Sequence, residues 1–262
     1  MKFSISNIAW DTEHDNEVYT LLQREGFDGI EIAPTRVFPS KPYEMLLQAK
    51  DFEKCLSSKY NLVVASIQSI WFGRKEEIFG SNKDRKILIE YTKSAIDFAC
   101  AVGCTNLVFG CPKNRITKND KDMGTAIDFF KNIGEYAQQK GTVLAIEPNP
   151  VIYGTNFINT TGQAFEFVKC VDCDGIRVNL DLGTVIYNHE SLHSIADNLY
   201  YVNHIHISEP NLVPIEKRQL HRDLAEVLYE KKYDHFVSIE MKNLGDLLAI
   251  KKTIEYVKGV FQ

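Results

Sequence analysis

The sequence lacks long apolar runs and has no excess of basic charge. No stretch approaches the roughly 20 apolar residues of a membrane-spanning helix, and the first residues (MKFSISNIAWD) contain no apolar segment long enough for a signal peptide. We therefore expect a cytoplasmic protein with no membrane partner. The net charge is −5 and the pI is about 5.8. These values argue against a nucleic-acid partner, because nucleic-acid-binding proteins usually present a basic face.

Cysteines are few for a chain of 262 residues, and they are scattered. Their positions are best explained by free thiols in a reducing compartment. The single CxxC, Cys170 to Cys173, falls at a predicted helix end. Because no second CxxC accompanies it, the sequence does not favour a zinc or redox role for this pair.

Linkers, low-complexity segments and phosphate-binding fingerprints are also missing; no GxGxxG or GxxxxGK[ST] follows a predicted strand. What recurs instead is a helix, a glycine and then a strand, as at Gly26, Gly103 and Gly141. Glycine is the usual left-handed cap of a helix, and a strand directly after it is typical of a βαβ series. Helix starts are also indicated, by a capping box at Thr160–Gln163 and an N-cap at Ser81–Asp84.

The pattern predicts eight strands alternating with eight helices. The strands are expected at 2–8, 29–32, 62–69, 105–110, 142–147, 176–181, 202–208 and 235–241. The helices are expected near 16–25, 43–59, 83–102, 122–140, 161–171, 190–199, 218–231 and 246–259. Eight alternations over this length predict an α/β protein, a (β/α)8 TIM barrel that forms one domain over residues 1–262. A doubly wound open sheet is the alternative.

Four consecutive predicted strands end in, or carry near their end, a possible metal ligand: Glu147, Asp181, His206 and Glu240. The steps between them are 34, 25 and 34 residues (181−147, 206−181, 240−206), close to the roughly 30 residues of one strand–helix–strand unit. A carboxylate at the end of a buried strand is costly unless it is paired, hydrogen-bonded or bound to a metal. In TIM barrels the active site lies at these strand ends.

Strand alternation predicts that the four side chains point into the barrel, since the aliphatic residues of each strand fall on the opposite face. Asn179, His204 and Ser238 lie one pleat deeper on the inner face, where they could hydrogen-bond the ligands from behind.

Three crowded carboxylates would repel one another and raise each other's pKa, and a divalent cation removes that problem. Oxygen donors with one nitrogen suit one divalent metal ion, namely Mn²⁺, Co²⁺, Mg²⁺ or Zn²⁺, and the residue types do not choose among these. A single acid at a strand end is usually salt-bridged or solvated, but the four together favour the metal site.

The run from Glu147 and Asp181 through His206-Ile-Ser-Glu209-Pro-Asn211 to Glu240 resembles the xylose-isomerase-like TIM barrels, as do GFDGIEI and the closing SIEMK. That superfamily contains ketose 3-epimerases, hydroxypyruvate isomerases, inosose dehydratases and endonuclease IV. The HxSEPN segment looks closest to the ketose 3-epimerase branch. The resemblance implies that the four residues bind the metal. It also implies that Glu147 and Glu240 are the acid–base pair on opposite faces of the substrate.

Two positions depart from that family pattern. The epimerases place a histidine three residues after the aspartate, where this chain has Thr184, and an arginine after the Asn of SEPN, where it has Leu212. Both family residues contact substrate oxygens, so the departures bear on substrate identity and not on the metal site. His221, His189 or Arg36 could substitute for them.

The chemistry expected first is that of a metal-dependent sugar or sugar phosphate isomerase or epimerase. A divalent cation would act as a Lewis acid that stabilises the enediolate formed when the carbon beside a carbonyl loses its proton. One glutamate takes the proton and the other returns one from the opposite face. If the same enediolate loses a β-hydroxyl instead, the enzyme is a dehydratase.

Two other classes are open to the sequence. A nuclease like endonuclease IV would need three zinc ions and extra histidines on early strands, but only His14 precedes residue 189. A non-catalytic sugar-binding barrel is compatible with Thr184 and Leu212. However, two opposed glutamates serve no purpose in a binding site. The expected partner is a small carbohydrate, and a homodimer or homotetramer is possible.

Several residues beyond the metal ligands are candidates for substrate contact. Trp10 and Trp71 follow the first and third strands, where they would either wall the cavity or pack onto the barrel. Glu31 and Gln68 end strands two and three, and a structural hydrogen-bonding role is favoured for them. The further candidates for substrate contact are Asn149, Glu209, Asn211 and His221. A phosphate could be bound by Arg36, Arg74 and Lys113, although scattered cations are usually solvated.

Overall fold

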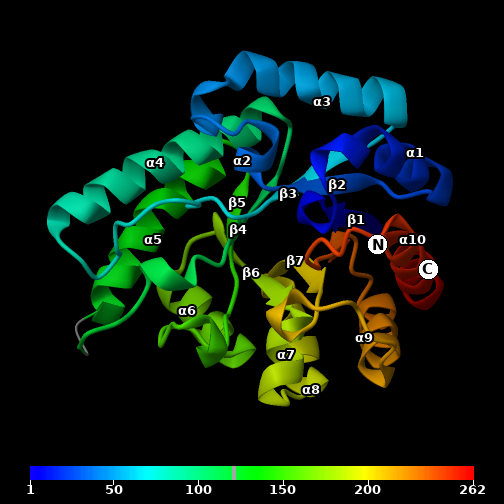
Figure 1. Cartoon of the computed structure of the whole chain (residues 1–262). Coiled ribbons are helices and arrows are strands. Elements are labelled where there is room, and N and C mark those ends of the chain that lie inside the picture. Colours follow the sequence, from blue (N-terminus) through cyan, green and yellow to red (C-terminus); the bar gives the residue numbers. More distant parts are fainter. Residues whose placement is uncertain (120–121) are drawn as a thin grey trace.

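Eight parallel strands close into a barrel in a computed structural model that describes residues 1–119 and 122–262 (Figure 1). Each strand pairs with the next along the chain, and β8 pairs with β1. The predicted TIM barrel is confirmed, the open sheet is wrong, and every strand lies within its predicted range. The strands are β1 Lys2–Ser6, β2 Gly29–Ile32, β3 Val63–Ile67, β4 Asn106–Phe109, β5 Val143–Ile146, β6 Ile176–Asp181, β7 Val202–Ile207 and β8 Phe236–Ile239.

Helices form a ring around the barrel, with α3 and α1 above the strands in Figure 1, α4 to α6 on the left and α9 and α10 on the right. The sequence did not predict α2 and α7, two short helices that follow β2 and β6 almost directly. The helices are α1 Asp15–Glu25, α2 Pro34–Val37, α3 Leu46–Tyr60, α4 Asn82–Ala101, α5 Asp122–Gln139, α6 Thr161–Val171, α7 Leu182–Asn188, α8 Leu192–Asp197, α9 Gln219–Glu230 and α10 Leu247–Phe261.

Local signals explain where helices begin and end. At the start of α4, the Ser81 hydroxyl accepts from the Asp84 N–H and the Asp84 carboxylate accepts from the Ser81 N–H, both at 3.1 Å. Thr160 and Gln163 form the same reciprocal pair at α6, so both predicted capping signals are confirmed. Helix α1 ends at Gly26, whose φ of 73° lies in the left-handed region that glycine favours.

The strands direct aliphatic side chains toward the helices and polar side chains toward the barrel axis. The residues next to the four candidate ligands are aliphatic and fully buried in the core: Ile146, Leu180, Ile205 and Ile239. The register places Asp181 opposite His206 and His206 opposite Ser238. The polar residues of β6, β7 and β8 are thereby brought side by side at one end of the barrel.

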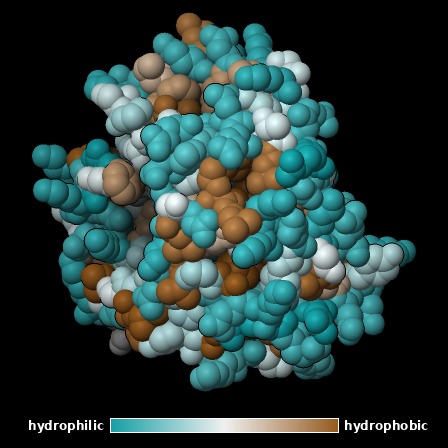
Figure 2. Space-filling view, turned by 45° about the vertical axis from the view of Figure 1, so that its right-hand side comes forward, coloured by the Kyte–Doolittle hydropathy of each residue, from teal (hydrophilic) through white to brown (hydrophobic). Residues whose placement is uncertain are grey.

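The outer surface is mostly hydrophilic on the face that Figure 2 shows. Figure 2 shows the face on the α10 side, where apolar side chains gather in a hollow near the centre and polar side chains surround them. Within the described part of the chain, no helix combines the length and the apolar character that crossing a membrane requires. All six cysteines are free thiols, and Cys170 is exposed at the end of α6.

Candidate metal centre

Glu147, Asp181, His206 and Glu240 converge at the C-terminal ends of β5, β6, β7 and β8, and one ligand atom of each lies within 4.8 Å of the others. The Nδ1 atom of His206 lies 2.9 Å from Glu147 Oε1 and 3.2 Å from Glu240 Oε2. The structure therefore brings together the four residues that the strand-end pattern singled out. Their role as metal ligands stays a prediction.

The electrostatics of this cluster fit a divalent cation. Burial raises the pKa of Asp181, and the nearby charge of Glu147 raises it further. Burial also raises the pKa of Glu240 to about 7, although the charge of His206 opposes the shift. Both shifts report that negative charge is destabilised at this position. A divalent ion bound by three carboxylates and one imidazole would remove the repulsion, and this donor set suits such an ion.

His206 is held from behind by Glu31, at the end of β2. The Nε2 atom of His206 lies 3.0 Å from Glu31 Oε2. Burial would raise the pKa of Glu31, but the neighbouring His206 and His204 lower it below its usual range, so Glu31 is ionised. Because an ionised carboxylate only accepts hydrogen bonds, Nε2 carries a hydrogen and Nδ1 faces the carboxylates. A carboxylate behind a histidine is the usual way in which proteins orient an imidazole toward a metal.

Charge also holds His206 in place. Burial would lower the pKa of His206, but the charges of Glu31 and Glu240 outweigh that effect and raise it well above its usual value. Without a cation, a proton on the imidazole therefore supplies the positive charge of the cluster.

Other polar residues of the inner face complete this network. Gln68 Nε2 donates to Glu31 Oε1 at 3.1 Å, which is the structural role favoured by the sequence. Asn179 Nδ2 donates to Glu147 Oε1 at 2.7 Å, as expected. His204 Nε2 lies 3.2 Å from Glu31 Oε2 but forms no hydrogen bond with a candidate ligand among the described residues, so the expectation for His204 is wrong. The expectation for Ser238 is wrong, since its hydroxyl has no hydrogen-bond partner among the residues that the structure describes.

Thr184, one of the two departures from the family pattern, supports Asp181. Its backbone N–H and its hydroxyl each lie 2.7 Å from Asp181 Oδ2, and Ser208 donates to the other carboxylate oxygen. Asp181 is thus both the N-cap of α7 and a member of the cluster. The departure at Thr184 leaves the orientation of the candidate ligand well defined.

The sequence pattern did not single out two residues that lie near the cluster. Arg115 is fully buried, and its Nη2 donates to Asn149 Oδ1 at 2.6 Å. Tyr153 lies in a short 3-10 helix, Val151–Tyr153, and its hydroxyl accepts from the Asn211 N–H at 2.8 Å. Burial, together with the negative charges of the cluster, raises the pKa of Tyr153 to about 12. Both residues lie in irregular loops after strands, and that position was the one available signal.

The two tryptophans have packing contacts. Trp10 donates from Nε1 to Asp15 at 2.8 Å and meets Tyr19 edge to face. Trp71 donates to the Thr92 hydroxyl of α4 at 2.9 Å and is buried. These contacts match packing onto the barrel, the second of the two roles that the sequence left open.

The remaining predicted residues lie away from the cluster. Glu209 is buried and forms a two-point ion pair with Arg218, at 2.7 and 2.6 Å. His221 is buried on α9, where Nδ1 lies 3.0 Å from the Tyr256 hydroxyl, and burial lowers its pKa to about 4. His189 caps the exposed end of α7. Among the described residues, none of these contacts reaches the four candidate ligands.

A cavity of about 960 Å³ lies over the loops that follow β1, β2 and β3. Phe72, exposed by 69%, contributes to its lining. Arg36, Lys41 and Arg74 also line it, but each is ion-paired with a carboxylate, at 2.7, 3.0 and 2.5 Å. The cations suggested for phosphate binding are thus already neutralised in part, and Lys113 does not line this cavity.

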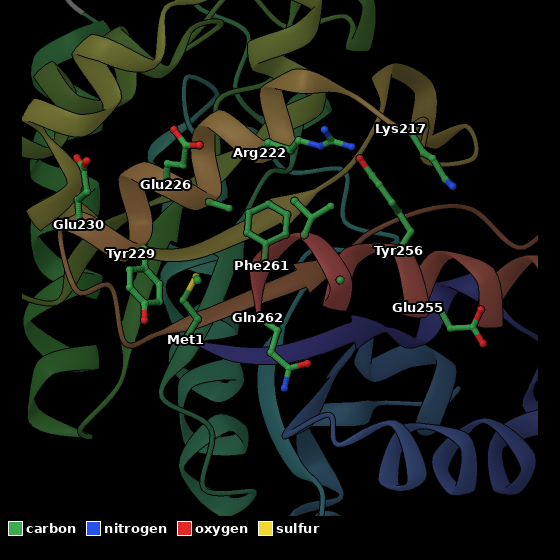
Figure 3. Close-up of a pocket in the computed structure, with 13 residues that line it drawn as sticks. Met1, Lys217, Arg222, Glu226, Tyr229, Glu230, Glu255, Tyr256, Phe261 and Gln262 are labelled. Carbon is green, nitrogen blue, oxygen red and sulfur yellow. The ribbon is translucent and has the colours of Figure 1, made fainter.

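A second hollow of about 760 Å³ runs along the outside of the molecule between α9 and α10 (Figure 3). Tyr229, Phe261 and both chain termini, Met1 and Gln262, contribute to its lining. None of the four clustered residues lines this groove, so the concentrated chemistry of the chain lies elsewhere, at the end of the barrel.

A closed (β/α)8 barrel with acids and a histidine at consecutive strand ends defines a class of TIM barrels with a candidate metal site. Comparison with family models is more specific: residues 19–259 match the xylose isomerase-like TIM barrel. The chain therefore belongs to this family. A comparison with curated proteins gave no significant match.

Solved structures with the same fold include sugar epimerases. The chain is similar to 3-keto-D-glucoside 4-epimerase YcjR from E. coli (TM-score 0.78, 19% identity, 99% of each chain). It is also similar to D-psicose 3-epimerase from Clostridium cellulolyticum, solved with D-tagatose (TM-score 0.81, 16% identity, 100% of each chain). A third is the probable 3-DHS dehydratase AsbF from Bacillus anthracis (TM-score 0.72, 15% identity, 98% of this chain and 99% of that one). At these identities the similarity establishes the shared fold.

Proposed function

We propose that the protein is a metal-dependent sugar epimerase or isomerase that moves a proton at a carbon next to a carbonyl. The observation that carries the proposal is the placement of Glu147 and Glu240. Both carboxylates lie within 3.2 Å of the same His206 nitrogen, yet they come from the separate strand ends of β5 and β8. An inversion at carbon requires two acid–base groups, and two carboxylates that reach one point from separate strands can supply them.

The residues that would hold the metal are Glu147, Asp181, His206 and Glu240. When bound there, a divalent ion would supply Lewis-acid stabilisation of negative charge on the substrate oxygens. Glu240, whose pKa is about 7, can both give and take a proton near neutral pH. One carboxylate removes the proton from carbon, and the electron pair of that C–H bond enters the enediolate.

The return of the proton decides the reaction. Delivery to the same carbon from the opposite face inverts that carbon, and delivery to the former carbonyl carbon isomerises the sugar. Loss of a β-hydroxyl from the enediolate would make the enzyme a dehydratase, and the fold is shared with a protein described as a probable dehydratase. Epimerases recur among the neighbours and act on a 3-keto-D-glucoside and on D-psicose by their names, so epimerisation is the first choice.

The cavity over the β1 to β3 loops is lined by none of the four clustered residues, so it would receive only a substrate group that extends well away from the metal. Its cations are paired with carboxylates, and Phe72 presents an exposed ring. Paired charges offer hydrogen-bond donors and acceptors without excess charge. They favour a neutral sugar over a sugar phosphate.

The proposal can be tested by solvent deuterium exchange. The protein is loaded with Mn²⁺ and incubated in D₂O with D-psicose, D-tagatose or D-fructose, and deuterium at carbon is followed by NMR. We expect incorporation by the wild type and a loss of at least about 100-fold in Glu147→Gln and Glu240→Gln. Glu190→Gln is the matched control, since this glutamate caps α6 away from the cluster.

Three outcomes are informative. A product lighter by one water would identify a dehydratase. Equal exchange rates in the wild type and both variants would refute the acid–base assignment. The absence of exchange with every ketose, including a 3-keto-glucoside, would refute the proposal.

A further inference from the structure

We propose that Arg115 is a positioning residue of the metal centre, which acts through Asn149 to fix the carboxylate of Glu147. The inference rests on the proposed function in taking Glu147 as a metal ligand. It assigns a purpose to a buried cation that strand periodicity does not explain.

Arg115 follows a short 3-10 helix, Pro112–Asn114, in the loop after β4, and its side chain is 0% exposed. Burying a guanidinium is costly unless its hydrogen bonds are satisfied. Its Nε and Nη1 atoms, however, have no hydrogen-bond partner within the part of the chain that the structure describes. This side chain is therefore held by the hydrogen bonds of Nη2 and by the ring of Phe109, whose centroid lies 5.6 Å from the guanidinium carbon.

Both bonds of Nη2 lead to the loop that carries Glu147. This atom donates to the backbone oxygen of Glu147 at 2.8 Å and to Asn149 Oδ1 at 2.6 Å. Asn149 then donates from Nδ2 to Glu147 Oε2 at 3.1 Å. A single side chain, that of Asn149, thus links the Arg115 guanidinium to the Glu147 carboxylate.

The cation decides which way the Asn149 amide points. Arg115 has donors only, so the amide must present its oxygen to the guanidinium, and its NH₂ group then faces Glu147. If Arg115 is removed, Asn149 Oδ1 loses its donor, and only the hydrogen bond from Nδ2 to Glu147 still orients the amide. Arg115 thereby keeps the NH₂ group of Asn149 directed at the Glu147 carboxylate.

The rest of Asn149 cannot move to compensate. Its backbone N–H donates to Ile158 at 3.0 Å, and its carbonyl accepts from Asn159 Nδ2 at 2.8 Å. Thr155 also donates to the carbonyl oxygen of Arg115, at 3.1 Å. The two loops are therefore joined at several points, and the amide orientation is the freedom that remains.

The two carboxylate oxygens of Glu147 consequently have different partners. Oε2 faces Asn149, while Oε1 faces Asn179 and His206, at 2.7 and 2.9 Å. Gly110 leaves the room that this arrangement needs, because a Cβ there would lie 2.6 Å from Oε2. Loss of the contact at Oε2 would allow the carboxylate to rotate, and Oε1 would no longer be fixed toward the other ligands.

The test measures Mn²⁺ affinity by calorimetric titration, so it needs no sugar. Arg115→Met and Asn149→Ala should each weaken binding by about 10-fold or more, the usual effect of losing a residue that orients a ligand. The double variant should bind no more weakly than Asn149→Ala alone, because both changes break one path. Arg115→Lys, which keeps the charge and N–H donors, should recover part of the affinity.

Arg85→Met is the matched control, since this arginine also donates to loop carbonyls, at 3.1 and 2.9 Å, but does not contact the cluster. We expect it to lower thermal stability and leave Mn²⁺ affinity unchanged. If circular dichroism shows that Arg115→Met is unfolded, Arg115→Lys replaces it in the comparison of the single variants with the double variant.

The outcomes separate this inference from the proposed function. Wild-type affinity in the Arg115 and Asn149 variants would overturn the positioning role and leave the metal site standing. Strictly additive losses would overturn the path through Asn149. A wild-type protein that binds no Mn²⁺, Co²⁺, Mg²⁺ or Zn²⁺ would overturn this inference together with the proposed function.

Discussion

Glu31 offers the sharpest test of how the candidate metal centre is built. The substitution Glu31→Gln keeps the shape of the side chain but replaces an acceptor-only carboxylate by an amide. In the native protein, Glu31 Oε2 lies 3.0 Å from His206 Nε2. In the variant, the NH₂ group of the new amide can occupy that position, and it would then donate to Nε2. The imidazole hydrogen would move to Nδ1, the atom that faces the carboxylates.

The expected cost can be estimated. A histidine that carries its hydrogen on Nδ1 must change tautomer before that atom can bind a cation. Loss of a carboxylate behind a ligating histidine typically weakens metal binding by about 10–100-fold, or about 1.4–2.7 kcal/mol at 25 °C. The fold should also lose stability, because breaking a buried ion pair costs about 3–5 kcal/mol.

The assay is calorimetric titration with Mn²⁺ at a temperature at which circular dichroism shows the variant to be folded. Glu190→Gln serves as the control, because this carboxylate caps α6 at 3.1 Å from the Thr161 N–H and does not contact the cluster. It should reduce the melting temperature and leave Mn²⁺ affinity unchanged. If Glu31→Gln bound Mn²⁺ as tightly as the wild type, the reasoning about His206 would be refuted.

Three further predictions concern the pH dependence of metal binding, the space beside Glu147 and the cap of α6. Metal binding should weaken as the pH falls below 7, because Glu240, with a pKa of about 7, must lose its proton to ligate. The Kd for Mn²⁺ should rise by more than about 10-fold per pH unit there, because His206, whose pKa is also raised, must give up a proton in addition to the one lost by Glu240, and a Kd that does not change with pH would contradict this. Gly110→Ala should weaken Mn²⁺ binding by about 10-fold or more, since its Cβ would lie 2.6 Å from Glu147 Oε2, whereas Gly259→Ala, with open space around it, should not. Thr160→Ala removes the cap of α6 and should lower the free energy of unfolding by about 0.5–2 kcal/mol; an unchanged calorimetric melting temperature would show that the cap does not stabilise the fold.

The barrel was predictable because its signals are local and repeated. Glycines after helices, apolar strands and capping residues recur along the chain, and each constrains only a few neighbouring residues. The helices α2 and α7 were missed because they follow their strands almost without a loop, so no separate start signal precedes them. Asp181 illustrates the point, since it ends β6 and caps α7 at once.

The sequence alone also determined which residues gather at the end of the barrel. Parallel strands of a closed barrel end at one level, so polar residues at the ends of consecutive strands must meet there. That rule brought Glu147, Asp181, His206 and Glu240 together before any contact was known, and the structure places them within 4.8 Å.

Only the tertiary structure decided how those residues are held. Glu31 reaches His206 across 175 positions of sequence, and Arg115 reaches Glu147 across 32. Neither contact follows from a strand period or a capping motif: Glu31 and His206 lie on β2 and β7 and meet across the barrel, and the path of the loop after β4 places Arg115. The direction of Trp71, which packs on α4, was settled in the same way. The sequence alone therefore determined the barrel and the set of residues at its mouth, and packing between distant segments decided the orientation and charge of each.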